Sequence, residues 1–119
     1  MDAKVEQALR DDRVVDITTT GRKSGQPRRI EIWLHYFGEG VGYLTGSPGT
    51  RDWSANLLAN PQFTVHVKRG AQADRAAEAS PVRDPQERRR VLAQIYGEDE
   101  PRNEERVAGS PLLRVEIQS

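Results

Sequence analysis

The residues best suited to binding chemistry lie in a glycine-bounded turn at positions 20–29, which reads Thr-Gly-Arg-Lys-Ser-Gly-Gln-Pro-Arg-Arg. It carries cations and a hydroxyl beside the unpaired N–H groups of a turn: Arg22, Lys23, Ser24, Arg28 and Arg29. A guanidinium offers a planar fork of donors and an ammonium a point charge, so this turn suits an anion. The spacing is not that of a Walker A loop, which has four residues between its first glycine and Gly-Lys. The alternative is a solvated hairpin tip with ordinary surface cations.

A second anion-friendly turn occupies positions 45–52, Thr-Gly-Ser-Pro-Gly-Thr-Arg-Asp, between an expected strand and an expected helix. Its glycines allow a ligand to approach the backbone, and a helix N-terminus offers unpaired N–H donors. Arg51 adds positive charge, whereas Asp52 is expected to cap those donors and would repel a phosphate. The alternative is a plain connection between strand and helix. Because the two turns flank one hairpin, we expect them to converge at one mouth of a barrel.

Other residue types give weaker signals. His35 and His66 alternate away from apolar strand faces, and two histidines alone make a poor metal site, so structural roles are favoured and no metal is expected. No Ser–His–acid set and no carboxylate pair for acid–base work is evident. The aromatic residues on or near the expected strands could stack on a cofactor ring but are more often core: Trp33, Tyr36, Tyr43 and Trp53.

Composition narrows the class of protein. The chain has 119 residues, 18 Lys+Arg against 18 Asp+Glu, and no cysteine. This length fits a single domain, residues 1–119. A zero net charge argues against non-specific nucleic-acid binding, and the lack of cysteine excludes disulfides, thiolate metal sites and cysteine nucleophiles. There is no signal-like start and no apolar run of the ~20 residues that span a bilayer, so we expect a cytoplasmic protein.

The expected elements follow from apolar spacing and turn residues. Helices are predicted at 3–12, 53–59 and 84–96, the last with Asp84 as its N-cap and Pro85 after it. Strands are predicted at 14–20, 28–37, 41–45, 62–68, 72–79 and 112–117. Both faces of the 28–37 strand carry large side chains, so both are expected to be partly covered. The acidic residues 98–105 lack an apolar face and could form a long loop, a frayed helix or a disordered segment.

This order of elements predicts the α+β class. Hairpin-length connections imply antiparallel pairing. About six strands in so short a chain most simply close into a small barrel, with two or three short helices, because closure removes exposed edges.

Three segments together resemble the deazaflavin-dependent nitroreductases, also called the nitroreductase/quinone reductase family. They read Ile-Thr-Thr-Thr-Gly-Arg-Lys-Ser-Gly-Gln-Pro-Arg at 17–28, Val-Gly-Tyr-Leu-Thr-Gly-Ser-Pro-Gly at 41–49, and Asp-Trp-Ser-Ala-Asn-Leu-Leu-Ala-Asn-Pro at 52–61 followed by Phe-Thr-Val-His-Val at 63–67. The likeness is strongest over residues 14–70, which we take as the cofactor-binding part.

The resemblance implies a split β-barrel that binds coenzyme F420, a deazaflavin with a phosphodiester and oligoglutamate tail, as hydride donor. By position, the first turn would meet the anionic tail through Arg22, Lys23, Ser24 and Arg28. The second turn would hold the phosphate or ring edge through Gly46, Ser47, Gly49, Thr50 and Arg51, with Trp53 and Asn56 supporting it from behind. Family members also use tyrosines near the C-terminus, where this chain has only Tyr96. FMN is the alternative cofactor.

Three hypotheses follow. The first is an oxidoreductase that transfers a hydride from reduced F420 to a small electron-poor acceptor such as a quinone, an enone or a nitro compound. Its catalytic residues are unknown, and Tyr36, Tyr43, His35 or water could supply the proton. The second is a non-catalytic protein that binds a flavin, haem or lipid-like molecule. The third is a structural subunit that uses a barrel face to form a homodimer.

Overall fold

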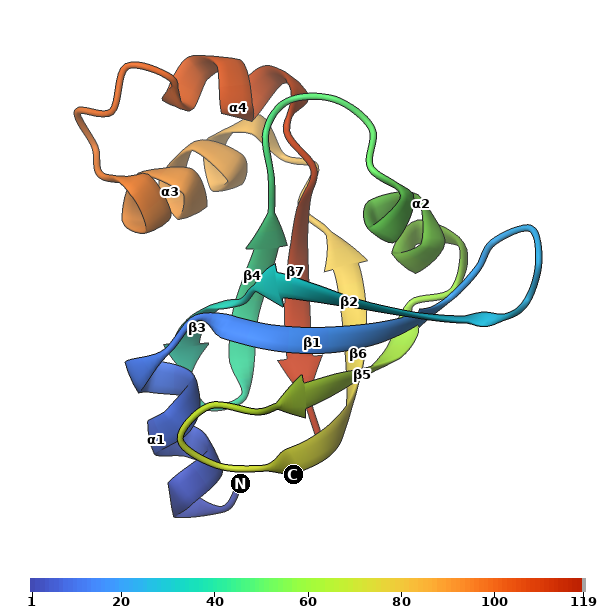
Figure 1. Cartoon of the computed structure of the whole chain (residues 1–119). Coiled ribbons are helices and arrows are strands. Elements are labelled where there is room, and N and C mark those ends of the chain that lie inside the picture. Colours follow the sequence, from blue (N-terminus) through green and yellow to red (C-terminus); the bar gives the residue numbers. More distant parts are fainter. Residues whose placement is uncertain (119) are drawn as a thin grey trace.

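Seven strands form one curled antiparallel sheet in the computed structural model, which describes residues 1–118 (Figure 1). The strands are β1 (Val14–Thr20), β2 (Pro27–Trp33), β3 (His35–Gly38), β4 (Val41–Thr45), β5 (Gln62–Val67), β6 (Ala73–Pro81) and β7 (Leu112–Ile117). The helices are α1 (Ala3–Asp11), α2 (Asp52–Ala59), α3 (Pro85–Tyr96) and α4 (Asn103–Gly109). The sheet order is β2-β1-β5-β6-β7-β4-β3. The predicted α+β antiparallel class is confirmed, with seven strands and four helices rather than about six strands and two or three helices.

The additional strand arises because the predicted strand 28–37 is two strands. The chain pairs with β1 as far as Trp33, passes through Leu34, and then pairs with β4 as β3. The Leu34 amide donates to the carbonyl of Arg13 (2.8 Å), and its side chain is buried in the core. The sequence does not reveal this change of partner, because apolar residues alternate without a break across Leu34 and point inward both before and after the bend.

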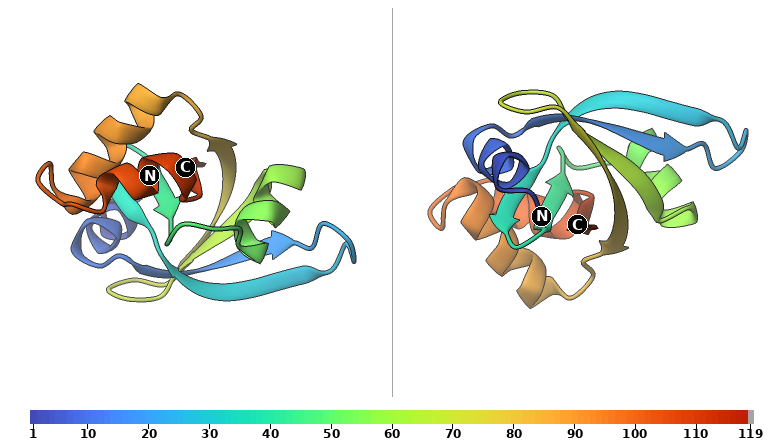
Figure 2. Two further views of the ribbon diagram at one scale, coloured as in Figure 1. Left: turned by 90° about the horizontal axis from the view of Figure 1, so that it is seen from above. Right: turned by 90° about the horizontal axis from the view of Figure 1, so that it is seen from below.

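The curled sheet does not close. β2 and β3 are the two ends of the strand order, so the expected removal of sheet edges does not occur within residues 1–118. The outward side chains of this segment are also less covered than expected, with Trp33 57% and Phe37 40% exposed. Figure 2 shows the curl from above and below, with the β1–β2 hairpin projecting beyond the rest of the sheet and α2 beside its tip.

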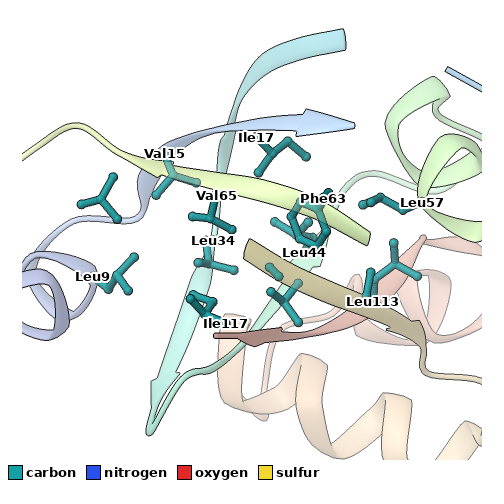
Figure 3. Close-up of a cluster of buried hydrophobic side chains, with 14 of the residues drawn as sticks. Leu9, Val15, Ile17, Leu34, Leu44, Leu57, Phe63, Val65, Leu113 and Ile117 are labelled. Carbon is teal, nitrogen blue, oxygen red and sulfur yellow. The ribbon is translucent and has the colours of Figure 1, made fainter. Parts of the chain in front are cut away.

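The main core fills the concave side of the sheet (Figure 3). Alternate residues of β1 and β5 point into it, and Leu9 of α1 and Leu57 of α2 pack from the helices. Burial of such side chains is the principal stabilising contribution to a fold of this size. A smaller cluster below α3 joins the helix to the sheet through Tyr43, Val82, Val91, Leu92 and Leu112.

The acidic segment 98–105 is partly helical. After a turn, α4 begins at Asn103 and packs against α3. The Asn103 amide donates to the carbonyl of Gly97 (2.7 Å), and the Arg106 guanidinium lies 3.7 Å from the centre of the Tyr96 ring. Arg88 and Arg89 of α3 also bind α4, through the carbonyls of Arg106 and Val107 and the carboxylate of Glu104. These partners lie 15 to 19 residues away, which explains why local pattern left loop, helix and disorder open.

Candidate functional site

A pocket of about 470 Å³ lies between the tip of the β1–β2 hairpin and the first turn of α2. Its lining comes from β1, the 21–26 turn, β2 and the start of α2: Thr19, Gly21, Arg22, Lys23, Ser24, Arg28, Ile30, Arg51, Asp52, Trp53 and Asn56. Arg22 and Arg51 thus lie in one pocket, although 28 residues separate them along the chain (51 minus 22, less one). The end of the second turn therefore lies beside the first turn, as expected, although the sheet around them is an open half-barrel and only Arg51 and Asp52 of the second turn line the pocket.

The first turn is tight because of its glycines. The Gly21 amide donates to the carbonyl of Gln26 (2.8 Å), and the Gly25 amide donates back to the carbonyl of Gly21 (2.9 Å). A Cβ atom on Gly21 would lie 2.6 Å from the Ser24 hydroxyl oxygen, and Gly25 has a φ of +69°. Glycine accommodates both features, so residues 22–24 are held at the mouth of the pocket.

Arg22 is fixed to α2 through side chains. The Asn56 Oδ1 atom accepts hydrogen bonds from the Arg22 backbone N–H (3.1 Å) and from Nη1 (2.9 Å). The Arg22 Nη2 group also pairs with Asp52 Oδ1 at 3.3 Å. The prediction that Asp52 caps α2 is wrong: Arg51 holds the N-cap position without a side-chain cap, and Asp52 is the first helical residue, where it neutralises Arg22. Asn56 supports the first turn, whereas the resemblance implied support of the second.

The side chains of Lys23 and Arg28 have no hydrogen-bond or ion-pair partner within the described part of the chain. Arg28 faces Thr19 across the β1–β2 ladder, and Ile30 faces Ile17, so these side chains share the inner face of the hairpin. The lining therefore contains four cations against one carboxylate, which is already engaged with Arg22. Ile30 and the half-buried Trp53 supply apolar surface beside that charge.

The second turn contributes less to this pocket than the first. Arg51 lines it, whereas Gly46, Ser47, Gly49 and Thr50 lie outside the lining. The loop is attached toward β7 and α4: the Thr45 hydroxyl donates to the carbonyl of Pro111 (2.6 Å), and the Gly49 amide donates to that of Gly109 (3.1 Å). A cofactor-binding role for those four residues stays a prediction.

Sequence reasoning did not single out Thr19, Gly21 and Ile30 as lining residues. The pairing register of the hairpin could have identified Thr19 and Ile30 as lining residues. A turn centred on residues 21–26 places Thr19 opposite Arg28, and alternation then puts Ile30 on the same face.

The proposed proton donors lie elsewhere. The Tyr36 hydroxyl donates to Glu6 and accepts from the Gly40 amide (2.7 Å), and Tyr43 packs against Phe37 with ring centres 4.9 Å apart. Burial, aided by the charge of Arg13, lowers the pKa of His35 to about 4. None of these three candidates lines the pocket, and three of its four cations, Arg22, Lys23 and Arg28, are exposed, so water can reach it.

The two histidines do not meet. His35 lies on β3 at one edge of the sheet, whereas His66 lies on β5, an interior strand separated from β3 by β6, β7 and β4. His66 bridges Thr18 Oγ1 (2.7 Å from Nε2) and Asp74 Oδ1 (2.7 Å from Nδ1), and this hydrogen bond lowers the pKa of Asp74. The favoured structural reading of His66 is consistent with these bonds. Residues 1–118 contain no cluster of His, Cys, Asp and Glu side chains suited to a metal ion, and no helix long and apolar enough for a membrane span.

Comparison with known protein families and sequences gives one match. A family model described as F420H(2)-dependent quinone reductase matches residues 1–112. No curated protein sequence matches the chain.

Solved structures at low identity share the split-barrel fold. A candidate pyridoxamine 5′-phosphate oxidase from Listeria innocua is 15% identical (TM-score 0.66, covering 98% of this chain and 92% of that one). The heme storage protein HutZ from Vibrio cholerae is 18% identical (0.68, covering 99% and 90%). A FAD-binding protein from Mesorhizobium loti is 16% identical (0.63, covering 100% and 91%). At these identities the likeness concerns the fold.

Proposed function

Because this chain belongs to the F420H(2)-dependent quinone reductase family, we propose that it is an oxidoreductase that binds coenzyme F420 in the pocket between the β1–β2 hairpin and α2. The acceptor is a small electron-poor molecule, namely a quinone, an enone or a nitro compound. The observation that carries the proposal is the convergence of four cations from two distant turns on one pocket.

The residues present suit such a molecule. Lys23 and Arg28, which lack protein partners in the described chain, are placed to pair with a phosphodiester or carboxylates. Ile30 and Trp53 offer apolar surface for a ring system. A volume of about 470 Å³ lies in the range of small-molecule sites. Reduced F420 supplies a hydride when bound, and the chain's part is to orient the ring and admit the acceptor.

The proton that accompanies hydride transfer is assigned to solvent. Tyr36, Tyr43 and His35 do not line the pocket, and the cations at its mouth are exposed. Water can therefore reach the site without a dedicated side-chain acid. A homodimer, in which a second copy of the chain would complete the site, is a separate prediction. Sedimentation of the protein with and without cofactor tests it.

The test is a titration of purified protein with oxidised F420, followed by turnover of reduced F420 with menadione. We expect binding in the micromolar range, with Lys23→Ala weakening it by about 1–3 kcal/mol, the usual value of a charge-assisted contact. Lys4→Ala, which removes an exposed cation from α1, is the matched control and should leave affinity unchanged. Lack of binding at tens of micromolar F420 would refute the proposal.

The second candidate is a non-catalytic binding protein, which the lack of a tyrosine or histidine in the pocket lining favours. Parallel titrations with FMN and with haem separate the two functions. Tight binding of either ligand without binding of F420, or F420 binding without acceptor turnover, would support this alternative.

A further inference from the structure

A second pocket, of about 560 Å³, lies on the other side of α2. It is bounded by α2, the end of β6, the start of α3, and the junction of α4 with β7. From α2 it is lined by Ser54 and Leu58, whereas Asp52, Trp53 and Asn56 line the first pocket. The two pockets share no lining residue, so a ligand in one does not contact the walls of the other.

Most of the lining is apolar. The apolar wall residues are Leu58, Pro81, Val82, Pro85, Val107, Ala108, Pro111, Leu112 and Leu113. Leu58 is 54% exposed and extends this apolar surface at the edge of the pocket. The charged lining residues are two arginines, Arg83 and Arg88, and no carboxylate is present. The pocket thus combines an apolar wall with uncompensated positive charge.

The Arg88 guanidinium is held by backbone carbonyls rather than by a carboxylate. It donates to four backbone carbonyls, those of Val82 (2.8 Å), Arg106 (3.1 Å), Val107 (2.9 Å) and Ser110 (2.5 Å). No carboxylate within residues 1–118 forms an ion pair with it. Desolvation lowers the pKa of Arg88, which means that the charged form is disfavoured where it sits. An anion nearby would relieve that cost.

Two further groups at this pocket lack partners. Arg83 is exposed and has neither a hydrogen bond nor an ion pair from its side chain in the described chain. The Ser110 hydroxyl oxygen is buried without a hydrogen-bond partner. Buried polar groups are normally satisfied, so this hydroxyl is an exception, but its oxygen is fully buried and a ligand in the pocket does not reach it without a local rearrangement.

We propose that the second pocket binds an apolar molecule that carries a single carboxylate. The carboxylate pairs with Arg83 and neutralises the field of Arg88, and the apolar body covers Leu58 and Val107. Charge complementarity selects this occupant over a neutral apolar one, because the lining offers two cations and no anion. The inference goes beyond the proposed function and does not depend on it, since the first pocket takes no part.

The probe is decanoate, added to the full-length protein while backbone amide shifts are followed by NMR, with decanol as the uncharged counterpart. We expect saturable shifts at Leu58, Arg83, Val107 and Ser110, with half-saturation below about 1 mM. Decanol should bind at least fivefold more weakly. Arg83→Glu should weaken decanoate binding about tenfold and leave decanol binding unchanged, whereas Arg90→Glu, an exposed position of α3, should change neither. Arg83 is substituted rather than Arg88, because the Arg88 guanidinium donates to four backbone carbonyls and the loss of Arg88 would disturb the fold.

Several results would overturn the proposal. These are a lack of shifts at 5 mM decanoate (on the order of fivefold above the expected half-saturation), equal affinity for decanol, or shifts at Lys23 and Arg28 instead. A dimer in sedimentation that Leu58→Asp dissociates, together with no decanoate binding, would mean that a second copy of the chain covers this pocket. F420 titrations in the same samples report on the first pocket alone, so failure of one proposal is distinguishable from failure of the other.

Discussion

Arg28 and Arg29 are neighbours in sequence but belong to opposite faces of the β1–β2 hairpin. Arg28 faces inward, lines the first pocket and has no protein partner in the described chain. Arg29 faces outward and pairs with Asp16 at 3.0 Å. Asp16 also pairs with Lys68 at 2.8 Å, and Lys68 contacts Glu31. The cations of the outer face are therefore paired with carboxylates of the same face, whereas Arg28 on the inner face has no carboxylate partner.

The contrast shows that cation density alone does not identify a binding site. Exposed ion pairs contribute at most about 1 kcal/mol each, so the outer network chiefly keeps a polar sheet face compatible with water. Cations without a protein anion leave their charge available to a ligand. What distinguishes Arg28 from Arg29 is whether the side chain has a carboxylate partner, and this depends on the strand register.

Reversing the charge of each arginine in turn tests whether the two faces of the hairpin differ. Arg28→Glu should weaken F420 binding by at least about 2 kcal/mol, or about 30-fold, because an attractive contact becomes repulsive. Arg29→Glu makes the same chemical change one residue away on the outer face. It should alter affinity less than about threefold, the residual long-range effect in moderate salt. Equal losses in the two variants, measured by cofactor titration, would show that the inner face has no special role.

A smaller effect is expected from the support beneath the inner face. Asn56→Ala removes the acceptor for two Arg22 hydrogen bonds and should lower the free energy of unfolding by about 1–2 kcal/mol. Asn60→Ala, at the end of the same helix, is the control and should cost less than about 0.5 kcal/mol. Urea denaturation measures both. If Asn56→Ala proved neutral in stability and in F420 affinity, the tie between α2 and the hairpin would be irrelevant.

The smallest effect concerns the outer network. Hydrogen bonding from Lys68, with a further contribution from Arg29, lowers the pKa of Asp16 below its usual 3.8. The unfolded chain therefore takes up this proton first as the pH falls. The stabilisation by Asp16 is present above pH 3.8 and is lost as the pH falls below it, through the folded-state pKa.

Wild type should consequently exceed Asp16→Asn in stability at pH 6 by less than about 1 kcal/mol, and the gap should shrink toward pH 3. Urea midpoints at the two pH values measure this. Asp99→Asn, at a position with no ion pair in the described chain, is the comparison variant. A gap that widened on acidification would contradict the role given to Asp16.

Local patterns were sufficient for most elements. The Asp84–Pro85 start of α3 forms as predicted, with the Asp84 carboxylate accepting from the Glu87 amide at 3.0 Å, because capping depends on neighbours in sequence. The division at Leu34 was missed, because a change of strand partner depends on residues far along the chain. For α4 the sequence left loop, frayed helix and disorder open, because the helix is held in part by Arg88 and Arg89 of α3, which lie 15 to 19 residues away. Likewise, Asp52 looked like a cap by position, but it is the first residue of α2 and its carboxylate pairs with Arg22, 30 residues earlier in the chain.

Composition, turn chemistry and short-range alternation are local properties, so they were enough to predict the α+β class, to locate the two cationic turns and to reveal the likeness to a deazaflavin-dependent family. The three-dimensional arrangement was needed to show which cations are neutralised, that Arg51 but not Ser47 lines the first pocket, and that a second pocket lies behind α2. Those outcomes depend on register and on contacts between segments far apart along the chain, where a shift of one residue sends a side chain to the opposite face.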